Sequence, residues 1–211
     1  GKTTFFNCIS GELVPDAGEV TFEGTDLLRL APATRARRGI GRTFQRLELF
    51  GAMTVREHLL VAARAYRCRG RLVRDLTGRS RPSAAERAEA SEVLDLVGLG
   101  EVADQFAQSL SLGRGRLVEL GRALMCRPRL LFLDEPSSGL DVQETEVMGD
   151  VMLTVQREKG TAILLVEHDV PMVEKLASRT YVLDCGQLIA EGPTADVLSS
   201  LMSRANRYEH N

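Results

Sequence analysis

Short apolar runs alternate with stretches of helical period along the chain, and this alternation predicts a layered α/β fold. Strands are expected at residues 19–22, 41–44, 130–134, 162–166, 181–183 and 187–190, several of them closed by Gly24, Gly186 or Gly192. The run at 130–133 is apolar at every position, which is typical of a parallel strand covered on both faces. We therefore expect helices to pack against a sheet.

Helix starts carry recognisable capping chemistry. Three side chains with a hydroxyl or carboxylate are each followed three positions later by a glutamate, so that each can bond the other's backbone N–H group: Thr54 and Glu57, Ser83 and Glu86, and Asp141 and Glu144. These pairs predict helices near residues 55–66, 84–97 and 142–158. Two further helices are expected over residues 5–9, ending at Gly11, and over residues 112–125, capped by Ser111.

A mostly helical insertion is expected over residues 52–110, and it contains a cluster of arginines at residues 64–81. The cluster has no amphipathic period, which favours an exposed surface loop. Contact with lipid headgroups or with a membrane partner is the alternative interpretation.

Composition narrows the class of protein. The chain has 211 residues, and its 27 Lys and Arg against 29 Asp and Glu give a net charge of −2. That balance counts against a generally basic nucleic-acid or membrane-surface binder. A hydrophobic fraction of 44% with 27% charged residues is ordinary for a globular domain and excludes a disordered, collagen-like or coiled-coil chain. Four scattered cysteines form no CxxC pair, so we expect small core thiols rather than a zinc site or a disulfide framework.

The chain opens on Gly1-Lys2-Thr3-Thr4, which matches the end of the phosphate-loop pattern G-x-x-x-x-G-K-[ST]. In that pattern backbone N–H groups and the lysine ammonium hold nucleotide phosphates, and the hydroxyl reaches Mg²⁺. Four residues alone also fit an ordinary helix start with a solvated lysine. The helix expected directly afterwards favours the phosphate interpretation, because its N-terminal dipole would face the phosphates.

Two adjacent carboxylates, Asp134 and Glu135, follow the apolar run at 130–133. A strand that delivers two acids to its C-terminal end suits divalent-metal and water chemistry at a sheet edge. Asp134 would bind Mg²⁺ directly or through water, and Glu135 would polarise an attacking water. Two solvated acids at a strand end are the alternative.

With these motifs the chain resembles the nucleotide-binding subunits of ABC transporters over essentially its whole length. The further matching motifs are GRTFQ at 41–45, with Gln45 as the Q-loop glutamine, LSLGRGR at 110–116 as the signature, SGLD at 138–141 as the D-loop, and VEHD at 166–169, with His168 as the switch histidine. Each motif alone has an ordinary alternative, such as a polar strand end, a helix cap or a surface histidine. Their joint order carries the resemblance. The other two histidines, His58 and His210, are expected to be surface residues.

The resemblance implies an α/β fold of the P-loop NTPase type, an ABC nucleotide-binding domain. Its RecA-like ATP-binding core would comprise residues 1–51 and 112–211, and a mostly helical subdomain would comprise residues 52–111, ending at the signature. Because Gly1 falls inside the phosphate loop, we expect a fragment of a longer subunit. Such a chain would lack the N-terminal strand and most of the phosphate loop, and on its own it would bind ATP weakly or not at all.

ATP and Mg²⁺ are the ligands that the resemblance implies. The implied ATP-binding residues are Gly1, Lys2, Thr3, Thr4, Gln45, Ser111, Gly113 and Asp141, the implied metal ligands are Thr3, Gln45 and Asp134, and the implied catalytic residues are Glu135 and His168. The signature departs from the family pattern LSGGQQR at Leu112, Arg114 and Gly115. Gly113 is kept at the position where close backbone approach matters most.

The resemblance also implies partners. Two such domains pair head to tail, as homodimers or heterodimers, and each ATP lies between one phosphate loop and the other subunit's signature. Transmembrane permease subunits are the implied membrane partners, a solute-binding protein acts indirectly, and no nucleic acid is expected. The implied location is the cytoplasmic face of the plasma membrane. The stretches at 41–45 and 49–62 resemble the ATPase subunits of branched-chain amino acid importers, with urea, amides and other amino acids open as solutes.

Coupling of ATP hydrolysis to solute import is the leading functional hypothesis. The altered signature keeps a second hypothesis open, a nucleotide-gated binding or regulatory module with weak hydrolysis, or an inactive fragment. An ABC ATPase that acts on DNA or ribosomes is the third. The near-neutral charge and the lack of a long coiled-coil insertion count against it.

Overall fold

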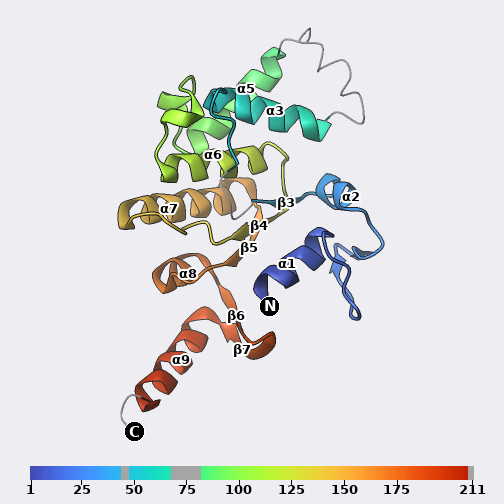
Figure 1. The fold of residues 1–211 in the computed structure, drawn as a ribbon, viewed down its shortest axis with the longest axis vertical. Coiled ribbons are helices and arrows are strands. Elements are labelled where there is room, and N and C mark those ends of the chain that lie inside the picture. Colours follow the sequence, from blue (N-terminus) through green and yellow to red (C-terminus); the bar gives the residue numbers. More distant parts are fainter. Residues whose placement is uncertain (44–47, 68–81, 209–211) are drawn as a thin grey trace.

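The computed structural model describes residues 1–43, 48–67 and 82–208. Gln45 lies outside these residues, as do His210, Cys68 and most of the arginine cluster. Figure 1 shows a small sheet in the middle of the molecule with helices above and below it. The elements are therefore layered as an α/β fold, as the hydrophobic pattern predicts.

Three parallel strands form the central sheet, in the order β3 (Ile40–Arg42), β4 (Leu130–Asp134) and β5 (Ala162–Val166). Successive side chains of a strand point to opposite faces. Leu131 and Leu133 therefore enter one hydrophobic core, and Phe132 enters another. All three are at most 1% exposed, which confirms that the apolar run is a parallel strand covered on both faces.

Helix α1 (Lys2–Ser10) covers the face of the sheet to which Phe132 points. Phe6 is buried, and its ring centroid lies 5.3 Å from that of Phe132. The helix ends where Gly11 adopts the left-handed conformation, with a φ of 90°, which favours glycine. The expected helix and its end at Gly11 are both confirmed.

A hairpin and a short helix follow α1: β1 (Thr21–Phe22), β2 (Thr25–Asp26) and α2 (Pro32–Arg37). The strand expected at 19–22 is thus shorter than predicted, because it begins two residues later, and it is followed by a turn at Gly24, whose φ is 72°. Helix α2 begins with proline at its first position and was not expected from the hydrophobic pattern. Its buried Arg35 donates to the carbonyl oxygens of Cys8 at 2.7 Å and Ile9 at 2.8 Å, which stabilises the last turn of α1.

The other face of the sheet is covered by helices that share one hydrophobic core with β4: α3 (Val55–Arg67), α5 (Ala84–Leu96), α6 (Leu112–Leu124) and α7 (Val142–Lys159), with the short 3-10 helices η1 (Gly100–Val102) and η2 (Ala107–Ser109) between them. All four predicted α-helices of this region are present. The helices α3 and α5 of the insertion share their core with α6 and α7. The division into a core and a helical subdomain at residues 52–111 stays a prediction.

Two of the three predicted capping boxes are complete, those that begin at Thr54 and Ser83. The third prediction is half wrong. Asp141 Oδ1 accepts from the Glu144 N–H group at 2.8 Å, but the Glu144 side chain bonds to another helix instead of returning the bond.

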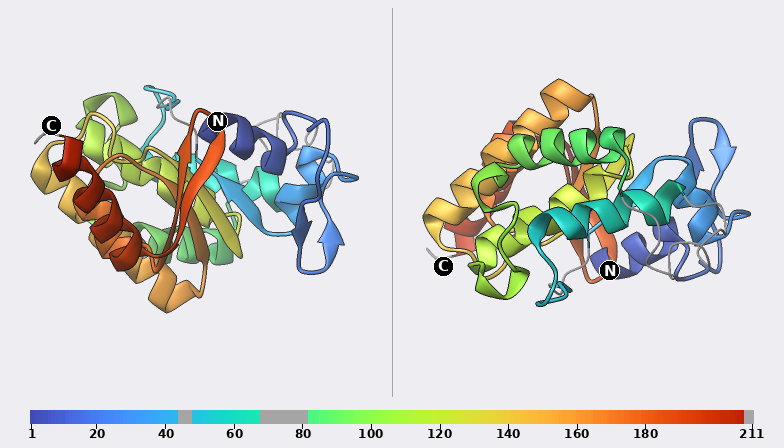
Figure 2. Two further views of the ribbon diagram at one scale, coloured as in Figure 1. Left: turned by 90° about the horizontal axis from the view of Figure 1, so that it is seen from below. Right: turned by 90° about the horizontal axis from the view of Figure 1, so that it is seen from above.

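The C-terminal part consists of α8 (Val170–Leu176), an antiparallel hairpin of β6 (Arg179–Asp184) and β7 (Gln187–Pro193), and α9 (Thr194–Tyr208). Figure 2 shows the tip of this hairpin beside the start of α1. A Cβ atom on Gly1 would lie 3.1 Å from Gly186 Cα, so the two backbones approach closely. Among the described residues, none of the helices combines the length and the hydropathy that a membrane span requires.

The expectation of core thiols is wrong for one cysteine. Cys185 is exposed, because it lies in the turn between β6 and β7. Cys8 and Cys126 are partly buried, and all three are free thiols.

His58 is 2% exposed, so the expectation of a surface histidine is wrong. Its Nε2 atom accepts from the Phe50 N–H group at 3.0 Å, so Nδ1 carries the hydrogen and donates to the Thr54 carbonyl at 2.9 Å. Burial lowers the pKa of His58 and outweighs the bond to Thr54, which raises it. The histidine therefore stabilises the loop before α3 in its neutral form.

We expect the protein to lose stability as the pH falls below about 6.5, the usual pKa of histidine in an unfolded chain. Because the pKa of His58 is lower in the folded protein, the unfolded chain binds the additional proton first, which reduces the free energy of unfolding by up to about 1.4 kcal/mol per pH unit. Chemical denaturation at a series of pH values measures this slope. His58→Gln keeps one donor and one acceptor without titrating, and it should flatten the profile. An unchanged slope in that variant would contradict the assignment.

Candidate functional site

Asp134 is the last residue of β4, the middle strand of the central sheet, and is 4% exposed. Burial raises the pKa of its carboxyl group, and the charge of Glu135 acts in the same direction. The positive charges of Arg42 and Lys2 oppose this rise. The start of α1 therefore lies within electrostatic reach of Asp134. A carboxylate that is desolvated in this way gains from a nearby cation.

Arg42, at the end of β3, connects Asp134 with the end of α1. Its Nη1 atom donates to Ser10 Oγ at 3.0 Å and to Glu12 Oε1 at 2.9 Å, and Nη2 lies 3.9 Å from Asp134 Oδ2. The side chain is 13% exposed, so its charge acts in a partly desolvated environment. The motif at 41–45 contains Arg42, but its pairing with Asp134 depends on the parallel register of β3 and β4, which the sequence does not show.

Glu135 and His168 are in direct contact. His168 Nε2 lies 2.7 Å from Glu135 Oε1, and because a carboxylate accepts, Nε2 carries the hydrogen of this bond. Glu135 has a left-handed backbone with a φ of 50°, and its N–H group donates to the Val166 carbonyl at 2.9 Å. The structure thus brings the two predicted catalytic residues together at the ends of β4 and β5.

The predicted phosphate-binding residues Gly1, Lys2, Thr3 and Thr4 begin α1, with Gly1 as its N-cap. The backbone N–H groups of a first helical turn point out of the helix and favour anions. A cavity of about 310 Å³ opens beside Gly1 and Lys2 and is lined on the other side by residues 183–186, at the end of β6 and in the turn that follows it. Its volume is at the lower end of the range of ligand pockets, about 300–1,000 Å³.

Ser111 and Gly113 lie at the start of α6, and Ser111 is its N-cap, as predicted. Both donate to one carboxylate, because Glu144 Oε1 accepts from the Ser111 hydroxyl at 2.9 Å and from the Gly113 N–H group at 3.2 Å. Glu144 lies in the first turn of α7, whose N-cap is Asp141. The signature donors therefore hold an anionic group of their own chain, in agreement with the preference of helix starts for negative charge. No feature of the sequence indicated this contact.

The predicted site residues fall into two groups. Lys2, Asp134, Glu135 and His168 gather around the ends of β4 and β5 and the start of α1. The signature residues and Asp141 surround Glu144, where α6 meets α7 on the opposite face of the sheet from α1 (Figure 1).

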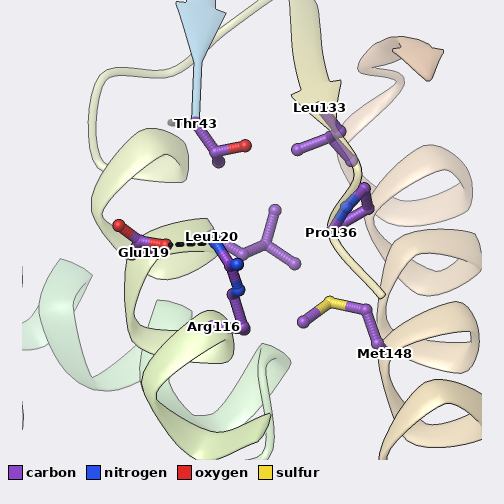
Figure 3. A pocket seen from close by; sticks show the side chains of 7 residues that line it. All are labelled: Thr43, Arg116, Glu119, Leu120, Leu133, Pro136 and Met148. Atoms are coloured by element: carbon purple, nitrogen blue, oxygen red, sulfur yellow. Dashed lines mark hydrogen bonds and ion pairs between the residues drawn. The ribbon is translucent and has the colours of Figure 1, made fainter. Parts of the chain in front are cut away.

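Helix α6 also forms hydrogen bonds to the backbone of Glu48, in the segment that follows the Q-loop motif at 41–45. Figure 3 shows Glu119 and Arg116 of this helix beside a small cavity near the end of β4. Glu119 Oε1 accepts from the Glu48 N–H group at 3.2 Å, and Arg122 Nη1 donates to the Glu48 carbonyl at 2.9 Å. Burial raises the pKa of Glu119. The backbone of Glu48, three positions beyond Gln45 in the sequence, is thereby attached to the signature helix.

Replacing Gly113 by alanine is expected to disturb the start of α6. A Cβ atom there would lie 2.6 Å from Glu144 Cδ, so the Glu144 carboxylate must shift, which weakens its bonds to Ser111 and Gly113. We expect the free energy of unfolding to fall by about 1 kcal/mol or less, measured by chemical denaturation, because the Glu144 side chain is flexible and alanine favours the helix more than glycine does. The same substitution in a Glu144→Ala protein should cost much less. An equal cost in both backgrounds would contradict the steric reason.

Comparison with known proteins places this architecture in a family. A family model described as ABC transporter matches residues 1–138. The methionine import ATP-binding protein MetN of Mesorhizobium japonicum is 35% identical over 205 residues, which are 96% of this chain and 53% of the relative. The high-affinity branched-chain amino acid transport ATP-binding protein LivG of Escherichia coli K12 is 36% identical over 196 residues, which are 91% of this chain and 76% of the relative. A crystal structure of the ADP conformation of an ATP-binding cassette of an ABC transporter matches with a TM-score of 0.78 and 34% identity, over 94% of this chain and 80% of that chain.

The chain spans about half the length of MetN and about three quarters of the length of LivG. The family model covers well over half of the chain, and the parallel sheet, the order of the motifs and the solved structure agree with it. The chain therefore belongs to the ABC transporter family, as an ATP-binding domain homologous to ATP-binding proteins of branched-chain amino acid transport.

Proposed function

We propose that this domain hydrolyses ATP to drive the import of branched-chain amino acids. The observation that carries the proposal is the contact between Glu135 and His168 beside the buried Asp134. LivG, which is named for branched-chain amino acid transport and is 36% identical, suggests the class of solute. The solute does not need to touch this subunit, so its class rests on that relative.

The phosphates of ATP would bind at the start of α1. Lys2 supplies a compact positive charge, and Gly1 allows the backbone to approach a ligand closely. The cavity of about 310 Å³ beside these two residues leaves space for a polar ligand. Thr3 and Thr4 add hydroxyl groups and first-turn N–H groups on the same helix start.

The donor set at the end of β4 fits Mg²⁺. This ion prefers oxygen ligands and is usually held by one or two protein groups together with water and phosphate oxygens. Asp134 offers a carboxylate whose desolvation a cation would offset, and Thr3 offers a hydroxyl. With Gln45 they would hold the ion, which when bound neutralises charge on the phosphates.

Glu135 would act as the general base that polarises the attacking water. Its bond to His168 restricts rotation of the carboxylate, and the bond from its own N–H group to Val166 fixes the backbone behind it. Arg42 contributes a positive charge close to Asp134, where negative charge would gather during hydrolysis.

A second ABC subunit would complete the site. In a head-to-tail pair, the Ser111 hydroxyl and the Gly113 N–H group of one subunit would bind ATP that is held by the other subunit, with Asp141 nearby. To do so, these two donors would first have to release Glu144 of their own chain. Permease subunits in the membrane would receive the resulting motion, and a solute-binding protein would deliver the amino acid. The subunit would then work at the cytoplasmic face of the membrane.

ATP turnover by the full-length subunit, with and without its permease subunits, tests the proposal. We expect hydrolysis that requires Mg²⁺, increases with the permease and exceeds the rate of a Glu135→Gln control by about 100-fold or more. A rate no faster than that control would favour the second hypothesis, a nucleotide-gated regulatory module.

A further inference from the structure

The loop between β5 and α8 carries His168, whose side chain is 65% exposed. An exposed side chain receives little guidance from packing, so the direction of the imidazole ring depends on the backbone that carries it. The contact of 2.7 Å with Glu135 therefore requires that the backbones of two separate loops keep a fixed distance. The neighbouring residue, Glu167, contacts both loops and can therefore fix the distance between them.

The Glu167 carboxylate accepts hydrogen bonds from both loops. Its Oε1 atom accepts from the Ser137 N–H group at 2.9 Å, in the turn that follows β4. Its Oε2 atom accepts from the N–H groups of His168 at 2.9 Å and Asp169 at 3.3 Å. Hydrogen bonds to an ionised acceptor are about twice as strong as those between neutral groups.

These bonds connect the two residues of the proposed catalytic pair. Ser137 lies two positions after Glu135, and His168 directly follows Glu167, so one carboxylate connects both backbones. Asp169 anchors the other side of the loop, because its side chain caps the first turn of α8. His168 is thereby held between a residue attached to the β4 turn and a residue attached to α8.

We infer that Glu167 is a positioning residue for ATP hydrolysis, which sets the distance between Glu135 and His168 by fixing the two loops that carry them. The inference rests on the proposed roles of Glu135 and His168. Glu167 acts only through backbone N–H groups and takes no part in proton transfer.

Two substitutions in the full-length subunit, assembled with its permease, test this role. Glu167→Ala removes both acceptor oxygens, whereas Glu167→Gln keeps one carbonyl oxygen and thus part of the connection. We expect the kcat of ATP hydrolysis to fall by about 10- to 100-fold in the alanine variant and by less in the glutamine variant, because a displacement of about 1 Å costs up to about 100-fold. The KM for ATP should stay within about twofold, since Lys2 and the start of α1 are unchanged. Glu174→Gln, which removes one charge from an exposed position on α8, should behave as wild type.

NMR of the imidazole nitrogens of His168 without nucleotide gives a readout that does not depend on turnover. The wild-type Nε2 resonance should be that of a hydrogen-bonded donor, and Glu167→Ala should shift it toward the resonance found in Glu135→Ala. If the alanine variant does not fold, the glutamine variant is compared in the same way.

A Glu167 variant with wild-type kcat and a wild-type His168 resonance would overturn the inference. So would a loss of kcat with a lower unfolding temperature and an unchanged His168 resonance, because Glu167 would then be a structural residue only. If the wild-type assembly hydrolyses no ATP, the proposed function fails, and the His168 resonance still decides whether Glu167 positions the histidine.

Discussion

Glu135→Gln is expected to slow ATP hydrolysis by about 10²- to 10⁴-fold, the usual contribution of a general base. An amide does not take a proton from water, but it has the same shape and still accepts a hydrogen bond from His168 Nε2. ATP binding should therefore be retained, because Lys2 and the start of α1 are unaffected. The ATP-bound pair of subunits should accumulate, since the step that separates it is slow.

Phosphate release in a single turnover gives the rate of this variant, and size-exclusion chromatography with ATP gives its state of association. Glu158→Gln, which removes an exposed charge near the end of α7, is the matched control and should hydrolyse ATP as wild type does. Hydrolysis by Glu135→Gln at the wild-type rate would show that another group activates the water.

His168→Ala is expected to lower ATP turnover by about 10- to 100-fold, because the Glu135 carboxylate loses the bond that restricts its rotation. The fold should be almost unaffected. The side chain is 65% exposed, and such surface substitutions change stability by about 0.5 kcal/mol or less, which corresponds to about 2 °C in Tm.

His58→Gln provides the contrasting variant, since His58 is buried and has no proposed role in ATP hydrolysis. It should lower the stability of the subunit while ATP turnover of the folded protein persists. An unfolding temperature of His168→Ala far below wild type would make His168 a structural residue, and unchanged turnover would exclude it from the reaction.

The sequence predicts local structure well where one side-chain type dominates. The apolar run before Asp134 indicates a strand covered on both faces, because only burial on both sides tolerates leucine or phenylalanine at every position. The hydroxyl side chains of Thr54, Ser83 and Ser111 mark helix starts, because their bonds reach only three residues along the chain.

The contacts missed by sequence reasoning join residues that are far apart in the chain. Glu144 lies 33 positions from Ser111, and Glu167 lies 30 positions from the Ser137 N–H group that it accepts from. The local sequence does not show whether the Glu144 side chain closes the capping box of its own helix or bonds to another helix. The individual roles of the site residues, including Gln45, stay predictions that the experiments above address.

Leucine uptake and phosphate release, measured together in vesicles that contain the full-length subunit and its permease, give the most direct measurement of the proposed coupling. We predict that uptake requires ATP, that leucine with its binding protein increases phosphate release, and that Glu135→Gln abolishes both. Phosphate release that equals that of Glu135→Gln, or that does not respond to any branched-chain amino acid, would contradict the proposal.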